Sequence, residues 1–248
     1  MNIVIPMAGG DTLFRQQGFP FPKPVIEIDG RPLIEHAFDC LKTIRNARFI
    51  FVIRKDDDLR FHLRDVLRHL APDAVVLQAD GETAGAACTV LLAAEYIDND
   101  EELVVANSDQ ILRLDLDAAI QSFRDRVLDG GTLVFDAVHP RWSFVKTNAD
   151  GLVVEAAEKR PISRNATAGF YYFREGRFFV EAAQNLIRKD ASVNGGYFVC
   201  PAFNEMILKQ RGIGIVPIAR EDYVSLATPQ AVEEYEQSLI AIKRQAQQ

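Results

Sequence analysis

Short runs of apolar and β-branched residues alternate with amphipathic stretches over the first half of the chain. Four such runs predict strands: residues 2–6, 48–53, 74–78 and 103–106. Apolar positions at helical spacing predict helices between these strands, within residues 33–44 and 59–70. This alternation is typical of parallel strands joined by crossover helices. It predicts an α/β fold, a Rossmann-like three-layer α/β/α sandwich around a mixed, mostly parallel central sheet.

The pattern changes after residue 109, where apolar runs come closer together and are separated by short turns. These runs predict antiparallel strands: residues 132–138, 143–147, 152–156 and 168–173. Helices at 176–189 and 201–210, a strand at 213–218 and a polar helix from Pro229 to the end complete the prediction. Because no repeat or low-complexity linker interrupts the chain, we expect residues 1–248 to form a single domain.

Composition and charge narrow the classes of protein. The 248 residues are 48% hydrophobic and 25% charged, which excludes disordered, collagen-like and coiled-coil proteins. The net charge of −7 disfavours nucleic-acid binding, because a polyanion would be repelled. The three cysteines lack the spacing of a metal site or a disulfide framework, which favours a reducing cytoplasm. No run of 18 apolar residues occurs, so we expect no membrane-spanning segment.

The first strand runs directly into Ala8, Gly9 and Gly10, a sequence of small residues that lets backbone N–H groups face a phosphate. The alternative is a simple tight turn. Further along, Lys23 stands between Pro22 and Pro24. We expect the two prolines to stiffen an extended segment, so that the ammonium is aimed at a phosphate. The alternative is a solvated loop lysine.

Asp109 directly follows the strand at 103–106. Open α/β sheets bind their ligands at the carboxyl ends of the strands, and a hard oxygen donor there suits Mg²⁺. The alternative is that Asp109 caps the next helix, for which Ser108 and Asp115 are also available.

These segments together resemble the sugar-phosphate nucleotidyltransferases, a family that opens with a strand, AGxGxRF, a variable loop and PKP. The similarity continues along nearly the whole chain, in residues 81–97, 106–110, 158–163, 168–173, 199–207 and 226–235. The chain is most similar to the compact branch found in bacterial capsule and surface-polysaccharide clusters.

The resemblance implies a Mg²⁺-dependent enzyme that transfers a nucleoside monophosphate from a nucleoside triphosphate to a phosphorylated sugar or a similar small acceptor. The acceptor phosphate attacks the α-phosphorus in line and pyrophosphate leaves, for synthesis of activated surface-polysaccharide precursors. It further implies a nucleotide-binding half (about 1–115), an acceptor-binding half (about 116–230), a C-terminal helix (about 229–248) and a homo-oligomer.

The resemblance also implies roles for individual residues. Those implied to bind the nucleotide are Ala8, Gly9, Gly10, Lys23, Gln78, Gly85, Ala86 and Asp109. Those implied to bind the acceptor are Trp142, Glu158, Lys159 and Gly169. Lys23, Asp109 and Lys159 are the implied catalytic residues. Asp109 is the implied Mg²⁺ ligand, with Asp222 as a substitute second ligand, because Ser225 stands where longer members carry aspartate.

Some of these positions have structural alternatives. Residues 81–87 also describe a helix start packed tightly on a sheet, Glu158 and Lys159 a surface ion pair, and Trp142 an ordinary core residue.

Several positions depart from the family pattern. Asp11 stands at the second glycine of the opening motif and Leu13 at its arginine, which removes a donor to the triphosphate. Gly196 and Ala227 are further departures. The first hypothesis is therefore a working transferase in which Arg15 or an acceptor-side group replaces the arginine.

Two alternatives remain. One is a noncatalytic homologue that binds a nucleotide or sugar phosphate. The other is a glycosyltransferase of related fold, although residues 107–110 supply a single carboxylate instead of the two of a DxD motif.

Overall fold

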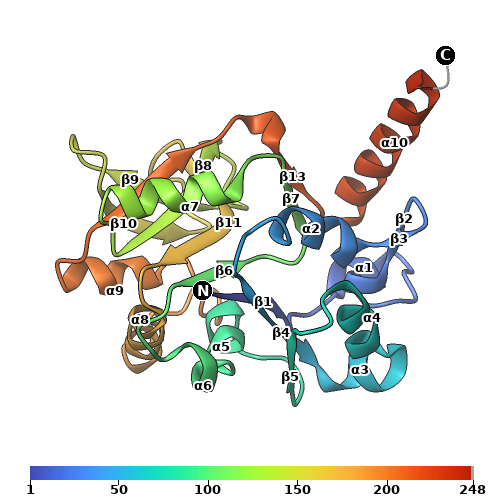
Figure 1. Cartoon of the computed structure of the whole chain (residues 1–248), viewed down its shortest axis with the longest axis horizontal. Coiled ribbons are helices and arrows are strands. Elements are labelled where there is room, and N and C mark those ends of the chain that lie inside the picture. The colour runs from blue at the N-terminus through green and yellow to red at the C-terminus, as the bar shows by residue number, and fades with distance from the viewer. Residues whose placement is uncertain (247–248) are drawn as a thin grey trace.

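The computed structural model describes residues 1–246 and contains a central nine-stranded mixed sheet (Figure 1). Four strands of the first half pair in parallel, in the order β6 (Leu103–Ala106), β1 (Asn2–Met7), β4 (Arg48–Arg54) and β5 (Val75–Ala79). They match the four predicted parallel strands within one residue at either end.

The second half extends the same sheet with mostly antiparallel strands. The long strand β11 (Asn165–Phe173) pairs antiparallel with β6, β8 (Gly130–Asp136) and β9 (Ser143–Thr147), and β9 pairs antiparallel with β10 (Val153–Glu158). The last strand of this sheet, β12 (Ile213–Pro217), pairs parallel with β8. The predicted change of pairing is confirmed. The division into two functional halves stays a prediction, but strands from both belong to one sheet.

Helices cover both faces of the sheet (Figure 1). Because alternate side chains of a strand point to opposite faces, Ile3 and Ile5 join one apolar cluster and Val4 joins the other. The first cluster contains residues of α2 (Leu33–Leu41), α4 (Leu63–Leu70) and α7 (Leu116–Asp125). The second contains residues of α5 (Ala86–Leu91), α6 (Ala94–Ile97), α8 (Gly176–Arg188) and α9 (Ala202–Leu208). The predicted three-layer sandwich is confirmed.

The helix predicted at 59–70 is instead two helices, α3 (Lys55–Phe61) and α4, which meet at His62. His62 adopts a left-handed φ of 51°. The side chain of Asp58 accepts the backbone N–H of Arg64 at 2.9 Å, a local hydrogen bond that competes with continued helix.

Several short elements outside the central sheet have no counterpart in the prediction. They are α1 (Thr12–Gln16), η1 (Lys23–Val25), the hairpin of β2 (Glu27–Ile28) and β3 (Arg31–Pro32), η2 (Arg220–Asp222), and the pair formed by β7 (Gln110–Leu112) and β13 (Tyr223–Ser225).

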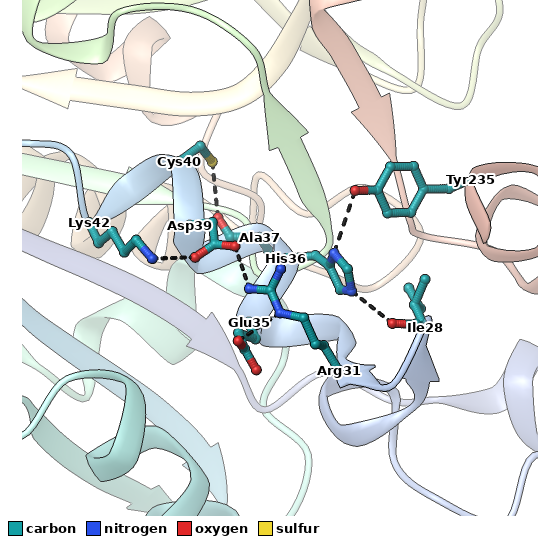
Figure 2. Close-up of polar contacts among 9 residues, drawn as sticks. All are labelled: Ile28, Arg31, Glu35, His36, Ala37, Asp39, Cys40, Lys42 and Tyr235. Carbon is teal, nitrogen blue, oxygen red and sulfur yellow. Dashed lines mark hydrogen bonds and ion pairs between the residues drawn. The ribbon is translucent and has the colours of Figure 1, made fainter. Parts of the chain in front are cut away.

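The C-terminal helix α10 (Pro229–Ala246) extends away from the sandwich (Figure 1). The last two residues of the predicted helix, 247–248, lie outside the described residues. Figure 2 shows how its first half is held: the His36 ring lies between the Ile28 carbonyl oxygen, 2.9 Å from Nε2, and the Tyr235 hydroxyl, 3.5 Å from Nδ1. Helix α10 is thereby attached to α2 and to the β2–β3 hairpin. Within residues 1–246, no helix has the length and apolar character needed to cross a membrane.

Candidate active site

A cavity of about 380 Å³ lies where β1 and β6 end. Residues that follow these two strands, among them Gly9 and Asp109, line one side of the cavity, together with Lys23. Trp142 and Glu158, from the β9 and β10 region, line the other side. The cavity therefore brings together predicted nucleotide-binding and acceptor-binding residues at the carboxyl ends of parallel strands.

Lys23 and Asp109 form an ion pair inside this cavity, with 2.7 Å between Nζ and Oδ2. Pro22 is extended, as predicted, but Lys23 already begins the turn η1. Burial lowers the pKa of Lys23, but the neighbouring Asp109 carboxylate outweighs this and raises the pKa overall. The lysine is therefore a held, charged group and not a solvated one.

Asp109 does not cap a helix. Asp109 lies in the turn that connects β6 to β7, and its carbonyl oxygen accepts the N–H of Leu226 at 2.7 Å. The cap of α7 is Asp115, whose side chain accepts the N–H of Ala118 at 3.0 Å. The carboxylate of Asp109 is thus not used as a cap; it lines the cavity, paired with Lys23.

Asp222 is not brought to Asp109. In the β7–β13 pair Ser225 lies opposite Gln110, whereas the Asp222 carbonyl accepts the N–H of Arg113. Arg113 lies about 13 Å beyond Asp109 along the strand at the usual rise per residue. Asp222 does not line the cavity, and Ser225 is the residue of β13 nearest the turn that holds Asp109; a second metal ligand at Asp222 stays a prediction. No group of three or more His, Cys, Asp or Glu side chains within residues 1–246 is arranged to hold a metal.

The loop that follows β1, residues 8–11, is called the glycine loop. It is exposed at Gly9 and Gly10, but its Asp11 is only 6% exposed. Its Oδ2 accepts a hydrogen bond from Arg54 Nη2 at 2.8 Å. Burial raises the pKa of the Asp11 carboxyl, and the positive charge of Arg54 offsets part of that increase. The acidic residue in the predicted phosphate turn is therefore paired with a buried guanidinium from the end of β4.

Arg54 is held from a second direction by Asp57, with 2.8 Å between Nε and Oδ2. Leu13, at the arginine position of the motif, is 55% exposed. Arg15 does not line the active-site cavity; it lines a separate cavity, together with Arg54 and Arg60. Arg54 was not predicted, because Arg54 and Asp11, 43 residues apart in the chain, come together only in the folded sheet.

The predicted base-recognition segment is brought to the cavity in part. Ala86 lines the cavity, and Gly85 before it has a φ of 107°. A Cβ on Gly85 would lie 2.4 Å from the Tyr197 carbonyl oxygen, so this position requires glycine. Gln78 lies on the edge strand β5, where its amide donates to Asp58, and it is not among the residues that line the cavity.

On the opposite side, Glu158 ends β10 and accepts a hydrogen bond from the Ser143 hydroxyl. Burial raises the pKa of the Glu158 carboxyl. Lys159 adopts a φ of 54°, and its Nζ lies 4.7 Å from the centre of the Phe198 ring. Phe198 lines the cavity and Lys159 does not. Glu158 and Lys159 therefore do not form the surface ion pair that was the structural alternative for them.

Trp142 combines a packing role with an exposed face in the cavity. Its ring packs edge-on against Phe135 and Tyr223, each with centroids 5.4 Å apart. The guanidinium carbon of Arg141 lies 4.3 Å from the centre of the Trp142 ring, and Arg141 also lines the cavity. Arg141 was not among the predicted site residues; its position next to Trp142 is the feature that points to it.

Gly169 lies in β11 where the register shifts between Thr167 and Tyr171. Its φ is 59°, and a Cβ there would lie 2.3 Å from Asn107 Nδ2. Its carbonyl oxygen accepts the N–H of Asn107 at 3.0 Å. The backbone of β11 thus lies close to the turn that carries Asp109, and the absence of a side chain at Gly169 makes this approach possible.

Comparison with known proteins gives consistent results. Residues 7–209 match the profile of the nucleotidyl transferase family. The UTP–glucose-1-phosphate uridylyltransferase of Haloferax volcanii is 27% identical over 224 residues, 88% of each chain. A nucleoside-diphosphate-sugar pyrophosphorylase from Vibrio cholerae RC9 superposes with a TM-score of 0.83 at 27% identity, over 95% of this chain and 99% of the other.

A putative glucose-1-phosphate thymidylyltransferase from Bacillus anthracis superposes with a TM-score of 0.72 over 95% of this chain and 94% of that one. At 18% identity it supports the fold alone. The family match covers most of the chain and includes the glycine loop, Lys23, Asp109 and Glu158. The chain therefore belongs to the nucleotidyl transferase family, as a nucleotidyltransferase of the sugar-phosphate pyrophosphorylase type.

Proposed function

We propose that this protein transfers a nucleoside monophosphate from a nucleoside triphosphate to a sugar 1-phosphate and releases pyrophosphate. The observation that carries the proposal is the cavity that the Lys23–Asp109 pair lines together with Glu158 and Trp142. The activities named for the Haloferax and Vibrio relatives support the same class of substrate.

In this reaction an oxygen of the acceptor phosphate attacks the α-phosphorus of the triphosphate. The bond between the α-phosphorus and the bridging oxygen breaks, and its electrons leave with pyrophosphate. Both reactants are anions, so catalysis consists mostly of positioning them and neutralising their charge. The charged Lys23 ammonium supplies positive charge on the side of the cavity that holds the glycine loop.

The donor set at Asp109 is compatible with Mg²⁺. A single carboxylate, next to the polar side chains of Asn107 and Ser108 that also line the cavity, suits an ion that keeps several waters and binds substrate phosphates. Asp109 would hold the ion. Bound Mg²⁺ would neutralise phosphate charge and orient the triphosphate.

The opposite side of the cavity supports acceptor binding. Glu158 offers a half-buried carboxylate that can accept hydrogen bonds from sugar hydroxyls, and Trp142 offers an apolar face. Arg141 places a guanidinium over that face, suited to an acceptor phosphate. Lys159 remains a proposed acceptor ligand whose ammonium would have to leave the Phe198 ring.

The wider setting is also part of this proposal. The product would be a nucleoside diphosphate sugar, consumed by glycosyl transfer, and the resemblance to the capsule-cluster branch supports a use in surface polysaccharide. Cys40, Cys88 and Cys200 are free thiols, which supports a reducing compartment such as the cytoplasm. The homo-oligomer stays a prediction.

The test measures pyrophosphate release by the purified protein with Mg²⁺, first from UTP and glucose 1-phosphate and then from ATP, CTP, GTP and dTTP with other sugar phosphates. We expect release with one matched pair, and a loss of about 10²-fold or more in Lys23→Met and Asp109→Asn. Release that persists in both variants, or silence across all pairs, would contradict the proposal. Silence combined with a thermal shift by a nucleotide would favour the noncatalytic homologue.

A further inference from the structure

Ser143, the first residue of β9, lies directly opposite Glu158, the last residue of β10, in the antiparallel pair of these two strands. Side chains that lie opposite each other in such a pair project from the same face, with Cβ atoms about 4.5–5.5 Å apart. The Ser143 hydroxyl donates a hydrogen bond to Glu158 Oε2, and both residues line the active-site cavity. The strand register therefore builds this contact into the acceptor side of the cavity.

The surroundings of the Glu158 carboxyl otherwise favour its neutral form. Burial raises its pKa, and the Ser143 hydrogen bond and the charge of Lys159 oppose that increase. Tyr171 and Cys200 are buried beside it, and burial raises the pKa of each well above its ordinary value, so both stay neutral. Within residues 1–246, the Ser143 hydroxyl is the only group that hydrogen-bonds this carboxylate. The hydroxyl is thus its main source of local stabilisation as an anion.

The other charged side chains that line the cavity do not hydrogen-bond Glu158. They are Arg141, beside Trp142, and Asp11, Lys23 and Asp109, near the glycine loop. Arg141 stacks on the Trp142 ring, and Lys23 and Asp109 are paired with each other. None of these groups is altered in the variants described below, so their titration is common to every measurement.

We propose that Ser143 is a positioning residue for acceptor binding: its hydroxyl holds Glu158 as an oriented carboxylate, with Oε2 occupied and Oε1 left for an acceptor hydroxyl. The inference rests on the proposed function and deepens it. An ionised carboxylate makes stronger hydrogen bonds with a hydroxyl than a neutral acid does. Without the Ser143 hydroxyl, burial shifts the carboxyl toward the neutral acid and nothing fixes which oxygen points at the acceptor.

The kinetic test measures kcat/KM for the sugar 1-phosphate, glucose 1-phosphate first, against pH at saturating nucleoside triphosphate and Mg²⁺. In the wild-type protein, protonation of Glu158 weakens acceptor binding, so kcat/KM falls on the acidic side. Ser143→Ala moves the midpoint of this fall up by about one pH unit, the effect of one lost hydrogen bond to a charged group. Its acceptor KM is about tenfold higher than that of the wild type below the midpoint and within about twofold above it, with kcat little changed.

Two matched variants separate positioning from structural damage. Ser143→Thr keeps the hydroxyl and suits a strand, so it retains the wild-type midpoint. Ser163→Ala removes a hydroxyl that donates to the Val145 carbonyl of the same strand β9 at 2.7 Å, outside the cavity, and also leaves the midpoint unchanged. A loss of activity in Ser143→Ala by the same factor at every pH would indicate a merely structural role and would overturn the inference.

The acceptor phosphate itself titrates near pH 6, at about the value of other phosphate monoesters, so its contribution has to be subtracted. Glu158→Gln supplies that correction, because its profile contains the phosphate titration without the carboxyl. Adding Ser143→Ala to Glu158→Gln produces no further shift of the midpoint. A shift of equal size in this background would show that Ser143 acts on something other than Glu158 and would contradict the proposal.

A measurement independent of turnover follows the side-chain carboxyl carbon of Glu158 by NMR in protein labelled with ¹³C-glutamate. The Glu158 signal is the one absent from Glu158→Gln. Its pKa rises in Ser143→Ala and not in Ser143→Thr or Ser163→Ala; an unchanged pKa in Ser143→Ala would overturn the inference. Absence of pyrophosphate release by the wild-type protein is a separate result, against the proposed function, and the carboxyl titration still decides whether Ser143 sets the state of Glu158.

Discussion

At the scale of single residues, the buried Arg54 decides how the acidic position in the glycine loop behaves. Its Nη2 binds Asp11 and its Nε binds Asp57, both at 2.8 Å. A carboxylate left unpaired there would repel phosphate. Paired with a guanidinium, it instead ties the loop to the end of β4. The loop therefore exchanges one arginine that points at the ligand for a buried ion pair that fixes the backbone.

Restoring the family residues one at a time should separate the stabilising role of the Asp11–Arg54 pair from the phosphate-binding role of an arginine at position 13. We expect Asp11→Gly to lower the free energy of unfolding by about 3 kcal/mol, the low end for breaking a buried pair, since Arg54 keeps Asp57. Leu13→Arg, at an exposed position, should change it by about 0.5 kcal/mol or less. Urea denaturation measures both. Equal stability of the two variants would show that the Asp11–Arg54 pair is not stabilising.

Glu158 makes the stability of the protein depend on pH. Burial raises its pKa in the folded state, so the folded protein binds this proton more tightly than the unfolded chain does. The stability linked to this proton is fully present below the unfolded pKa and is lost as pH rises through the raised folded pKa. Glu158→Gln removes the titration. The melting temperature of the variant should therefore exceed that of the wild type at pH values above the folded pKa, and the difference should be smaller at pH values below the unfolded pKa.

Melting curves from acidic to mildly alkaline pH test this expectation. Val154→Thr, at an exposed position on the same strand, serves as a control and should follow the wild-type pH profile. A difference between Glu158→Gln and wild type that stays constant with pH would contradict the raised pKa.

The residues that sequence could identify are those whose chemistry is visible locally. Lys23 between two prolines and Asp109 after a buried strand were predicted and lie together in the cavity. Arg54 and Arg141 were not, because their roles depend on contacts across the sheet and on the ring beneath. Asp222 was proposed from its nearness in sequence to Ser225, and the strand register separates it from Asp109.

At the scale of elements, the long strand β11 forms the boundary between the two sides of the cavity. Its C-terminal part pairs with β6 and its N-terminal part with β9, and the register shifts in between, at Gly169. A β-bulge of this kind bends a strand and changes the direction of its side chains. The shift lies between the part of β11 that pairs with β6 and the part that pairs with β9, the strand that follows Trp142.

A side chain at Gly169 should be poorly tolerated. Gly169→Ala meets both left-handed backbone strain and contact with the Asn107 and Gln110 side chains, 2.3 and 2.4 Å from the new Cβ. We expect a loss of about 2–5 kcal/mol of unfolding free energy, the sum of the two effects.

Gly151→Ala is the matched control, since φ there is +76° with nothing within 4 Å of the new Cβ. It should lose only about 1–2 kcal/mol, the strain alone. Equal losses in the two variants, measured by urea denaturation, would show that the close approach at Gly169 contributes nothing.

Long elements with a clear period were predictable, and short ones were not. The strands β1, β4 and β6 follow from uninterrupted apolar runs, since both their faces are buried. The break at His62 depends on a hydrogen bond that the Arg64 N–H donates to the Asp58 side chain, and the two-residue strands depend on their partners. Tertiary contacts decide such elements, so local pattern carries little information about them.

At the scale of the whole molecule, both sides of the active site belong to one sheet. We therefore expect a single cooperative unfolding transition, with equal calorimetric and van't Hoff enthalpies. A saturating nucleotide, at about 100 times its Kd, should stabilise the folded protein by about 2.7 kcal/mol. The whole transition should shift together in scanning calorimetry. Two resolved transitions, only one of them responsive to nucleotide, would contradict this expectation.

The continuity of β11 also limits how this protein can change over evolution or by engineering. The single strand β11 pairs with both β6 and β9. Neither half of the protein can therefore be replaced by the corresponding half of a relative as an independent unit. A chimaera would have to place its junction outside residues 165–173 and preserve the bulge register. New acceptors are therefore more accessible through substitutions in the loops around Arg141 and Phe198 than through recombination of whole halves.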